Sequence, residues 1–329
     1  MRIAIDAMGG DHAPAEIVKG ACLAAQDHGI DVLLVGDAAQ IAPILDELPH
    51  QYVEILHASD KIAMGAHPLE AVRKQKDSSI VVAANAVKQG QAQAFISAGS
   101  TGAAMAASLL SWGRIKGVER PAIGTILPTL NGPCVLVDSG AQVDAKPKQL
   151  LSFAAMGSVY AAQVLGVKNP RVGLLNIGEE ETKGSHLTLE TYPLLKDDQR
   201  INFVGNVEGR DVLTGVVDVL VCDGFAGNVV LKTIEGVAGV LFHLLKEALG
   251  SSLRAKAGAL LVKDALGTIK KRFDYAEYGG APLLGLNGVC IISHGSSDAK
   301  AIKNAIRVAH DAVKCQMVER IVATMAAGS

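Results

Sequence analysis

The sequence predicts an α/β fold in which helices cover a large, mostly parallel sheet. The first observation is an alternation of short apolar strands, expected at 3–6, 31–36 and 52–56, with helices near 15–28 and 41–48. This alternation is typical of a doubly wound parallel sheet. The second observation is composition, because glycine is abundant, at 35 residues, while aromatic residues make up only 4%. Such a profile favours small-residue helices packed on a sheet, with glycine at tight strand-to-helix turns.

Later segments continue the alternation. We expect strands at 94–99, 134–138, 172–177, 201–205, 218–222 and 288–295, and helices at 68–73, 79–89, 101–112, 147–165, 188–195, 227–249 and from 299 onward. A chain of 329 residues can form one large α/β domain or two smaller ones. We treat residues 1–329 as one catalytic domain. A net charge of −2 argues against nucleic acid as the main partner.

The cysteines indicate reduced core thiols rather than disulfides, metal ligands or nucleophiles. They are scattered, odd in number and without metal-ligand spacing: Cys22, Cys134, Cys222, Cys290 and Cys315. Met1 leads directly into a strand, so we expect no signal peptide. No apolar run approaches the roughly 20 residues that span a bilayer. We therefore expect a soluble intracellular protein.

The stretch from residue 172 to 184 is a candidate site. A buried strand runs into Asn176, then into three carboxylates at Glu179–Glu181, and then into Lys183. Ligands of open parallel sheets bind beyond the carboxyl ends of the strands. The alternative is a solvated loop that begins a helix, where acids are favoured by the helix dipole. We expect the glutamates to cap that helix and hold Lys183, because three carboxylates facing an anion would repel it.

Two other strand ends lead into helices whose first turns are rich in small residues. Free N–H groups at such an end form a good anion site, although ordinary N-capping explains the same residue types. We predict phosphate binding by the residues of these two ends: Ser97, Gly99, Ser100, Thr101 and Gly102 at the first, and Gly224, Gly227 and Asn228 at the second. Other polar residues at strand ends are predicted to orient these donors, or to act as structural caps: Asp6, Asp138, Asp223 and His294.

Two segments depart from the strand–helix pattern. Residues 59–77 form either a connecting excursion over the surface or a basic lid over the site. Residues 250–274 combine basic flanks with a small apolar centre, which predicts a protruding helical arm at an anionic membrane surface, a dimerisation arm, or both. The arm residues that carry this prediction are Arg254, Lys256, Leu260, Leu261, Lys263, Lys270, Lys271 and Arg272.

Common catalytic motifs are missing from the sequence. There is no G-x-G-x-x-G after the first strand, no G-x-x-x-x-G-K-[ST], no G-x-S-x-G, and no H-E-x-x-H or cysteine cluster for a metal. Without a prepared protein nucleophile, the favoured chemistry uses a substrate as nucleophile, while the protein positions groups and neutralises charge. Inorganic phosphate or a phosphorylated substrate suits the helix ends and Lys183.

Five motifs in order along the chain resemble the bacterial phosphate acyltransferase (PlsX) family. They are Ile3-Ala-Ile-Asp-Ala-Met-Gly-Gly-Asp11, Ser97-Ala-Gly-Ser-Thr-Gly-Ala103, Leu174-Leu-Asn-Ile-Gly-Glu-Glu-Glu181 with Lys183-Gly184, Asp218-Val-Leu-Val-Cys-Asp-Gly-Phe225 with Gly227-Asn228, and Tyr275-Ala-Glu-Tyr-Gly-Gly-Ala-Pro-Leu-Leu-Gly285. Ser100 and Gln142 stand where the family usually has Asn, and both remain polar hydrogen-bonding residues.

The resemblance implies a Rossmann-like α/β/α sandwich, akin to phosphotransacetylases and isopropylmalate dehydrogenases, with a protruding helical pair. It implies that inorganic phosphate attacks a long-chain acyl-acyl carrier protein, giving acyl phosphate and free carrier protein for phospholipid synthesis. It further implies a homodimer, peripheral membrane association at the inner face of the cell membrane, and no metal, nucleotide or other cofactor.

Within that reaction, we predict catalytic roles for Lys183 and Asn176. Lys183 would offset charge on phosphate or on the developing oxyanion, and Asn176 would donate a hydrogen bond. Two rival functions remain open from the sequence. One is a short-chain phosphotransacetylase that uses acyl-CoA, and the other is a non-catalytic membrane-associated scaffold that recruits carrier protein through residues 254–272.

Overall fold

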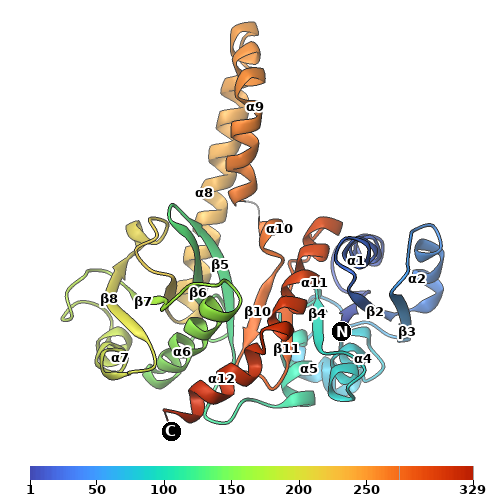
Figure 1. Ribbon diagram of the computed structural model, residues 1–329, viewed down its shortest axis with the longest axis horizontal. Coiled ribbons are helices and arrows are strands. Elements are labelled where there is room, and N and C mark those ends of the chain that lie inside the picture. Colours follow the sequence, from blue (N-terminus) through green and yellow to red (C-terminus); the bar gives the residue numbers. More distant parts are fainter. Residues whose placement is uncertain (274, 329) are drawn as a thin grey trace.

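A computed structural model describes residues 1–273 and 275–328, and for residues 270–276 it describes no side chains. In this part of the chain, eleven strands form one sheet (Figure 1). In sheet order they are β3 (Val53–His57), β2 (Asp31–Gly36), β1 (Arg2–Asp6), β4 (Ala94–Ser97), β11 (Val289–Ile292), β10 (Ala281–Leu284), β5 (Ala122–Thr129), β6 (Gly132–Val137), β9 (Val219–Val221), β7 (Arg171–Asn176) and β8 (Asn202–Glu208).

Helices cover both faces of this sheet. In chain order they are α1 (Ala15–His28), α2 (Ala38–Leu45), α3 (Pro68–Lys74), α4 (Ser79–Lys88), α5 (Thr101–Trp112), α6 (Pro147–Gln163), α7 (His186–Asp197), α8 (Gly224–Gly250), α9 (Leu253–Phe273), α10 (Tyr275–Tyr278), α11 (Ala299–Lys314) and α12 (Met317–Ala326). The predicted α/β/α class is therefore confirmed. β5, β10, α10 and α12 were not predicted from the sequence.

The sheet has an antiparallel centre that the sequence analysis did not anticipate. β10 is antiparallel to both of its neighbours, β11 and β5, and β5 is antiparallel to β6. After these three reversals, β6, β9, β7 and β8 run opposite to β11, β4, β1, β2 and β3. The strands of the two halves therefore do not all point toward one edge of the sheet. Their carboxyl ends leave the sheet at opposite edges.

The packed helices show that the two halves share one face of the sheet. We call it the α5 face, because α4 and α5 pack on one half of it and α8 packs on the other.

The side chains of β5 link the two halves of the α5 face. Ile123 packs in the cluster that contains α4 and α5 residues, and Leu127, four residues later on the same side of the strand, packs in the cluster beneath α8. Ala122 and Ile126, which alternate with these two residues along the strand, point to the other face, where α1, α6 and α11 form the largest core cluster. The ends of α5 and α8 thus lie over one continuous surface of the sheet.

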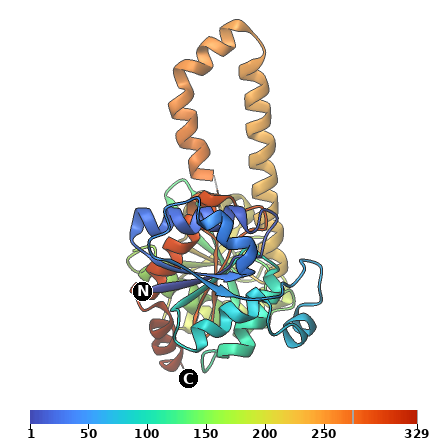
Figure 2. The same ribbon diagram turned by 90° about the vertical axis from the view of Figure 1, so that its right-hand side faces the viewer.

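α8 and α9 form an arm that projects from the body. α8 begins on the sheet and extends well beyond it, and α9 returns beside it (Figures 1 and 2). Among the described residues, α8 is the one helix long and apolar enough to cross a membrane by length and composition. The expectation that no apolar run is long enough to span a bilayer is therefore corrected. Isolated charged residues such as Lys232 and Glu235 interrupt the apolar sequence of α8, but its mean hydropathy stays high.

The first turn of α8 is fixed to β6 by a close backbone approach at Gly227. A Cβ atom at this position would overlap the backbone carbonyl oxygen of Asp138, and it would lie 2.9 Å from the Sγ atom of Cys222. The thiol of Cys222 also donates to the same carbonyl oxygen over 3.5 Å. Only glycine allows the helix to lie this close to the end of β6.

We predict that Gly227→Ala lowers the free energy of unfolding by about 3 kcal/mol, because the added methyl group must displace backbone atoms. The matched control is Gly236→Ala in the same helix, where a Cβ atom meets nothing within 4 Å. The control should gain about 0.5–1 kcal/mol from helix propensity. Urea unfolding followed by circular dichroism measures both variants, and equal stability of the two would contradict the close approach.

Candidate active site

At the ends of β1 and β4, a buried carboxylate organises the first group of predicted residues. The Ser97 hydroxyl donates to Asp6 Oδ2 over 2.8 Å, and the Met8 backbone N–H donates to Asp6 Oδ1 over 3.2 Å. The Gly99 N–H donates to Ser97 Oγ over 3.0 Å. Burial raises the pKa of the Asp6 carboxyl above its ordinary value, although hydrogen bonds from Ser79 and Ser97 oppose the shift. Asp6 thus holds the turn between β4 and α5.

The first turn of α5 retains unused donors. Ser100 caps the helix, with its Oγ accepting from the Ala103 N–H over 3.4 Å. Within the described residues, no acceptor is recorded for the backbone N–H groups of Thr101 and Gly102, and the Thr101 side chain is exposed. These two N–H groups satisfy the physical requirement for anion binding at a helix N-terminus.

Residues 59–77 lie against this same turn. The two ends of the segment are joined by an isolated parallel β-bridge between Asp60 and Ser78. α3, within the segment, packs on α5, and a Cβ atom at Gly102 would lie 2.6 Å from Cγ of Pro68. The segment therefore covers one side of the α5 N-terminus, while its role as a lid stays a prediction.

His294 belongs to the same group of strand ends. It follows β11, and its exposed ring has Nδ1 2.7 Å from the Ser296 hydroxyl oxygen. The next residue, Gly295, accepts a hydrogen bond from the Asp11 N–H over 2.8 Å. The loop after β11 therefore lies directly against the loop after β1.

The second group of predicted residues surrounds Asp138 at the end of β6. Its carboxylate accepts from the N–H groups of Ile123 over 2.8 Å, Gly140 over 3.2 Å, Ala141 over 2.9 Å and Gln142 over 2.6 Å. Burial raises the pKa of this carboxyl, and the hydrogen bonds oppose that shift. Ala141 packs against the same cluster of buried side chains as α5, so this loop connects the two groups.

The N–H groups at the start of α8 are already used, in contrast to those of α5. Asp223 Oδ1 accepts from the N–H groups of Phe225 and Ala226, both over 3.0 Å. The Gly224 N–H donates to the Gln142 carbonyl, and the Gly227 N–H donates to the Asp223 carbonyl.

The side chain of Asn228 is engaged as well, because its amide donates to the Ser139 carbonyl over 3.3 Å. Phosphate binding by Gly224, Gly227 and Asn228 stays a prediction, and it requires exchange of these bonds.

The loop after β7 is closed by Asn176. Its side-chain amide nitrogen donates to the Lys183 carbonyl over 2.9 Å, and its Oδ1 accepts from the Ile177 N–H over 2.9 Å. Asn176 therefore shapes the loop that carries Lys183. The Lys183 side chain is exposed, and no ion pair is recorded for it in residues 1–273 and 275–328.

The three glutamates of this loop do not act as expected. α7 is capped by Ser185, whose hydroxyl accepts from the Thr188 N–H, rather than by a glutamate. Glu181 pairs with Lys196 over 2.8 Å and accepts from the Tyr192 hydroxyl, so it does not hold Lys183. The hydrogen bonds and charge of Lys196 lower the pKa of the Glu181 carboxyl. Glu181 and Lys196 are fifteen positions apart in the chain, so their pairing could not be predicted from sequence spacing.

A pocket of about 360 Å³ lies beyond the ends of β6 and β9, where these loops meet the first turn of α7. This pocket was not predicted, because the residues that line it belong to three separate segments of the chain. It is lined by Val143, Asp144, Ala145, Leu187, Asp223 and Phe225.

The remaining predictions concern cysteines, metals and the arm. Cys22, Cys134, Cys222 and Cys290 are buried as expected, and burial raises the pKa of the Cys134 and Cys290 thiols to about 12, which disfavours the nucleophilic thiolate. Among the described residues, no group of three or more His, Cys, Asp or Glu residues has metal-binding geometry.

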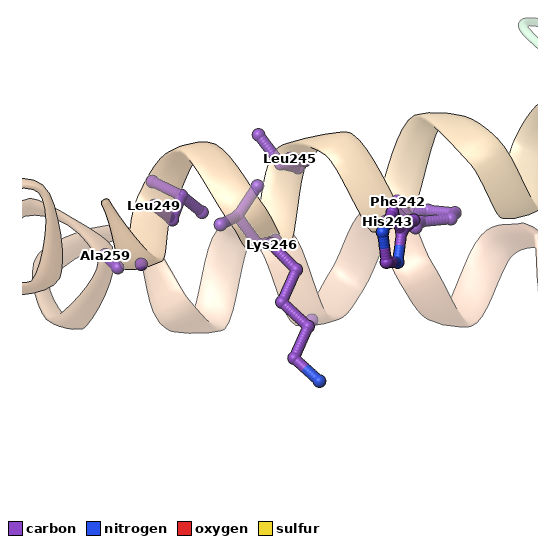
Figure 3. A pocket seen from close by; sticks show the side chains of 9 residues that line it. Phe242, His243, Leu245, Lys246, Leu249 and Ala259 are labelled. Carbon is purple, nitrogen blue, oxygen red and sulfur yellow. The ribbon is translucent and has the colours of Figure 1, made fainter.

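On the arm, the exposed residues include Arg254, Lys256, Leu260, Leu261 and Lys263. The predicted arm residues Lys270, Lys271 and Arg272 lie outside the described side chains. α8 and α9 also enclose a pocket of about 580 Å³, to which α8 contributes Phe242, Leu245 and Leu249 (Figure 3).

Comparison with solved structures supports the fold. The chain superposes on EutD phosphotransacetylase from Staphylococcus aureus with a TM-score of 0.63 and 15% identity, covering 94% of this chain and 93% of that one. A phosphotransacetylase from Streptococcus pyogenes gives a TM-score of 0.62 and 17% identity, with coverages of 97% and 94%. A 4-hydroxythreonine-4-phosphate dehydrogenase from Klebsiella pneumoniae gives 0.56 and 14%, with coverages of 95% and 99%. At these identities the likeness concerns the fold alone.

Comparison with known sequences identifies the family. The model of a family described as fatty acid synthesis protein matches residues 1–320. The phosphate acyltransferase of Desulfitobacterium hafniense (strain DSM 10664 / DCB-2) is 59% identical, covering 98% of this chain and 96% of the relative. Those of Heliobacterium modesticaldum and Nostoc sp. are 58% and 53% identical, each covering 98% of this chain and 96% and 95% of the relatives. The chain therefore belongs to the phosphate acyltransferase (PlsX) family of fatty acid synthesis proteins.

Proposed function

We propose that this protein transfers the acyl group of a long-chain acyl-acyl carrier protein to inorganic phosphate, producing acyl phosphate and free carrier protein for phospholipid synthesis. The observation that carries the proposal is 59% identity to a phosphate acyltransferase over 98% of the chain. An oxygen of phosphate attacks the thioester carbonyl carbon, a C–O bond forms and the C–S bond breaks. The electron pair leaves with the carrier's sulfur, which takes up the proton released by phosphate.

Phosphate is best accommodated at the N-terminus of α5. The N–H groups of Thr101 and Gly102 are free to donate there, and the Thr101 hydroxyl is exposed beside them. Oriented donors of this kind stabilise a dianion without reorganisation during the reaction. The α8 terminus is less suitable, because Asp223 already accepts from its N–H groups and adds a negative charge.

The loop after β7 supplies the cation. Lys183 is exposed on a loop that Asn176 holds closed, so its charge is available to phosphate or to the oxyanion that develops on the thioester oxygen. Asn176 serves this arrangement by positioning the loop, and it contacts the reacting groups only if its bond to the Lys183 carbonyl opens.

The arm supports a role at the inner face of the cell membrane. Leu260 and Leu261 are 77% and 89% exposed on α9, and Arg254, Lys256 and Lys263 lie on the same helix. Apolar side chains among basic ones favour an anionic lipid surface. The same exposed apolar residues, with those of α8, suit a homodimer in which two arms pack together.

A short-chain phosphotransacetylase that uses acyl-CoA is the second candidate function. It is favoured by one observation, the fold shared with two proteins named phosphotransacetylases. The chemistry is the same, and the two candidates differ in the donor and in the acyl group.

We predict that the purified protein consumes the thioester of a 16-carbon acyl carrier protein only when inorganic phosphate is present, with acyl phosphate as product. The measurement is loss of thioester and trapping of acyl phosphate by hydroxylamine. A 16-carbon acyl-CoA and a 2-carbon acyl-CoA serve as donor controls. Preference for the 2-carbon acyl-CoA would favour the second candidate, and no phosphate-dependent loss with any donor would refute both.

We predict that Lys183→Ala lowers kcat by about 10²–10³-fold, the usual cost of removing one preorganised electrostatic donor. Because Lys183 is exposed, the variant should unfold at the same urea concentration as the native protein. The matched control is Lys19→Ala, which removes an exposed lysine paired with Glu16 on α1. Turnover within threefold of the native rate in Lys183→Ala would remove this residue from the mechanism.

We predict that the double variant Leu260→Gln, Leu261→Gln reduces cosedimentation with vesicles containing anionic lipid by at least tenfold, because two apolar anchors are lost. Leu130→Gln is the matched control, since Leu130 is 74% exposed in the turn between β5 and β6. Analytical ultracentrifugation of the same samples reports the homodimer. Unchanged vesicle binding by the double variant would contradict membrane contact through α9.

A further inference from the structure

Large apolar side chains are exposed around the pocket at the start of α8. Phe225 is 63% exposed and Val143 is 58% exposed. Both line the pocket of about 360 Å³, together with Ala145 and Leu187. Exposed apolar side chains that gather around a hollow mark a binding surface more often than single ones do. Neither Asp6 nor Asp138, which organise the turns described above, contributes to this pocket.

The pocket opens close in the chain to the loop that carries Lys183. Val143 follows β6, Phe225 follows β9, and Leu187 lies in the first turn of α7, four residues after Lys183. In α/β sheets, ligands bind in the space beyond the carboxyl ends of the strands. A group held in this pocket therefore lies next to the loop that carries Lys183.

The charges at the rim define what the pocket can hold. Asp144 and Asp223 both line it, and the Asp223 carboxylate is oriented by its bonds to the first N–H groups of α8. Two carboxylates disfavour phosphate or any other anion at this place. The apolar side chains between them favour an uncharged hydrocarbon group.

An apolar path continues from the pocket along α8. Val229 and Val240 are exposed, and both lie within about 60° of Phe225 around the helix axis, given 3.6 residues per turn. A chain that leaves the pocket over Phe225 therefore meets further apolar surface in the direction of the arm. The hollow itself is small and is bounded by the loop after β6 and by the first turns of α7 and α8.

We propose that this pocket binds the acyl chain of the thioester donor beyond its first four carbons, and that Phe225 and Val143 make the enzyme selective for long chains. The inference rests on the proposed function, because the chain enters as part of the donor. The thioester carbon lies toward the Lys183 loop, and the methylenes lie against Phe225. Each methylene group that leaves water on binding contributes about 0.8 kcal/mol, which corresponds to an increase in affinity of about fourfold.

The test compares 16-carbon and 4-carbon donors on the same carrier. We expect Phe225→Ala and Val143→Asp to lower kcat/KM for the 16-carbon donor at least tenfold further than for the 4-carbon donor, mainly through KM. Phe225→Ala keeps the backbone N–H that Asp223 accepts, so the helix cap is retained. Tyr52→Ala is the matched control, because Tyr52 is 52% exposed at the far edge of the sheet. Equal losses for both donors, or no loss, would overturn the proposal.

A second measurement separates this inference from the proposed function. A fluorescent 16-carbon fatty acid is titrated into the native protein, Phe225→Ala and Tyr52→Ala in the absence of phosphate. At least tenfold weaker binding to Phe225→Ala alone supports an acyl pocket, even if no donor is turned over. Equal binding by all three proteins rejects the pocket, even if turnover is observed.

Discussion

The buried carboxylate of Asp138 is the interaction on which the arrangement of the site depends. It accepts N–H groups from Ile123 in β5 and from three successive residues of the turn after β6, so it ties the antiparallel centre of the sheet to that turn. The backbone carbonyl of Asp138 also lies against Gly227, which fixes the start of α8. A buried carboxylate without these donors would be strongly disfavoured, so the carboxylate and the turn stabilise each other.

The antiparallel centre explains why the site has two groups of residues. Because β10 and β5 reverse the strand direction, the Asp6 and Asp138 groups leave opposite edges of the sheet. The two groups are nevertheless connected, because Ala141 in the turn after β6 packs against the same cluster of buried side chains as α5. The two helix ends differ in charge and in free donors. The α5 end offers N–H groups to an anion, whereas the α8 end is capped by Asp223 and adjoins an apolar pocket. The proposed placement of phosphate at one end and of the acyl chain at the other rests on this difference.

Much of the fold was predictable because its signals are local. Strands such as β2 and helices such as α1 carry their own apolar pattern and turn residues, and their predicted bounds agree closely with the structure. β5 and β10 were missed for a physical reason. Pro128 and Pro282 lie within them, and proline usually argues against a sheet strand. At the site, Ser100 and Asp223 act as helix caps, which the sequence offered only as the alternative to phosphate binding and donor orientation. The partners of Asn176 and Glu181 were not predicted.

The sequence by itself determined the family, the class of fold and the residue types at each strand end, because these are written in contiguous motifs. Tertiary structure alone decided which donors remain free. The N–H groups of Thr101 and Gly102 and those at the start of α8 look alike in sequence, yet only the latter already have partners. The acyl pocket likewise depends on Val143, Leu187 and Phe225, which are far apart in the chain. Strand order and direction bring them together, because β6, β9 and β7 are parallel neighbours, and both follow from contacts between distant residues.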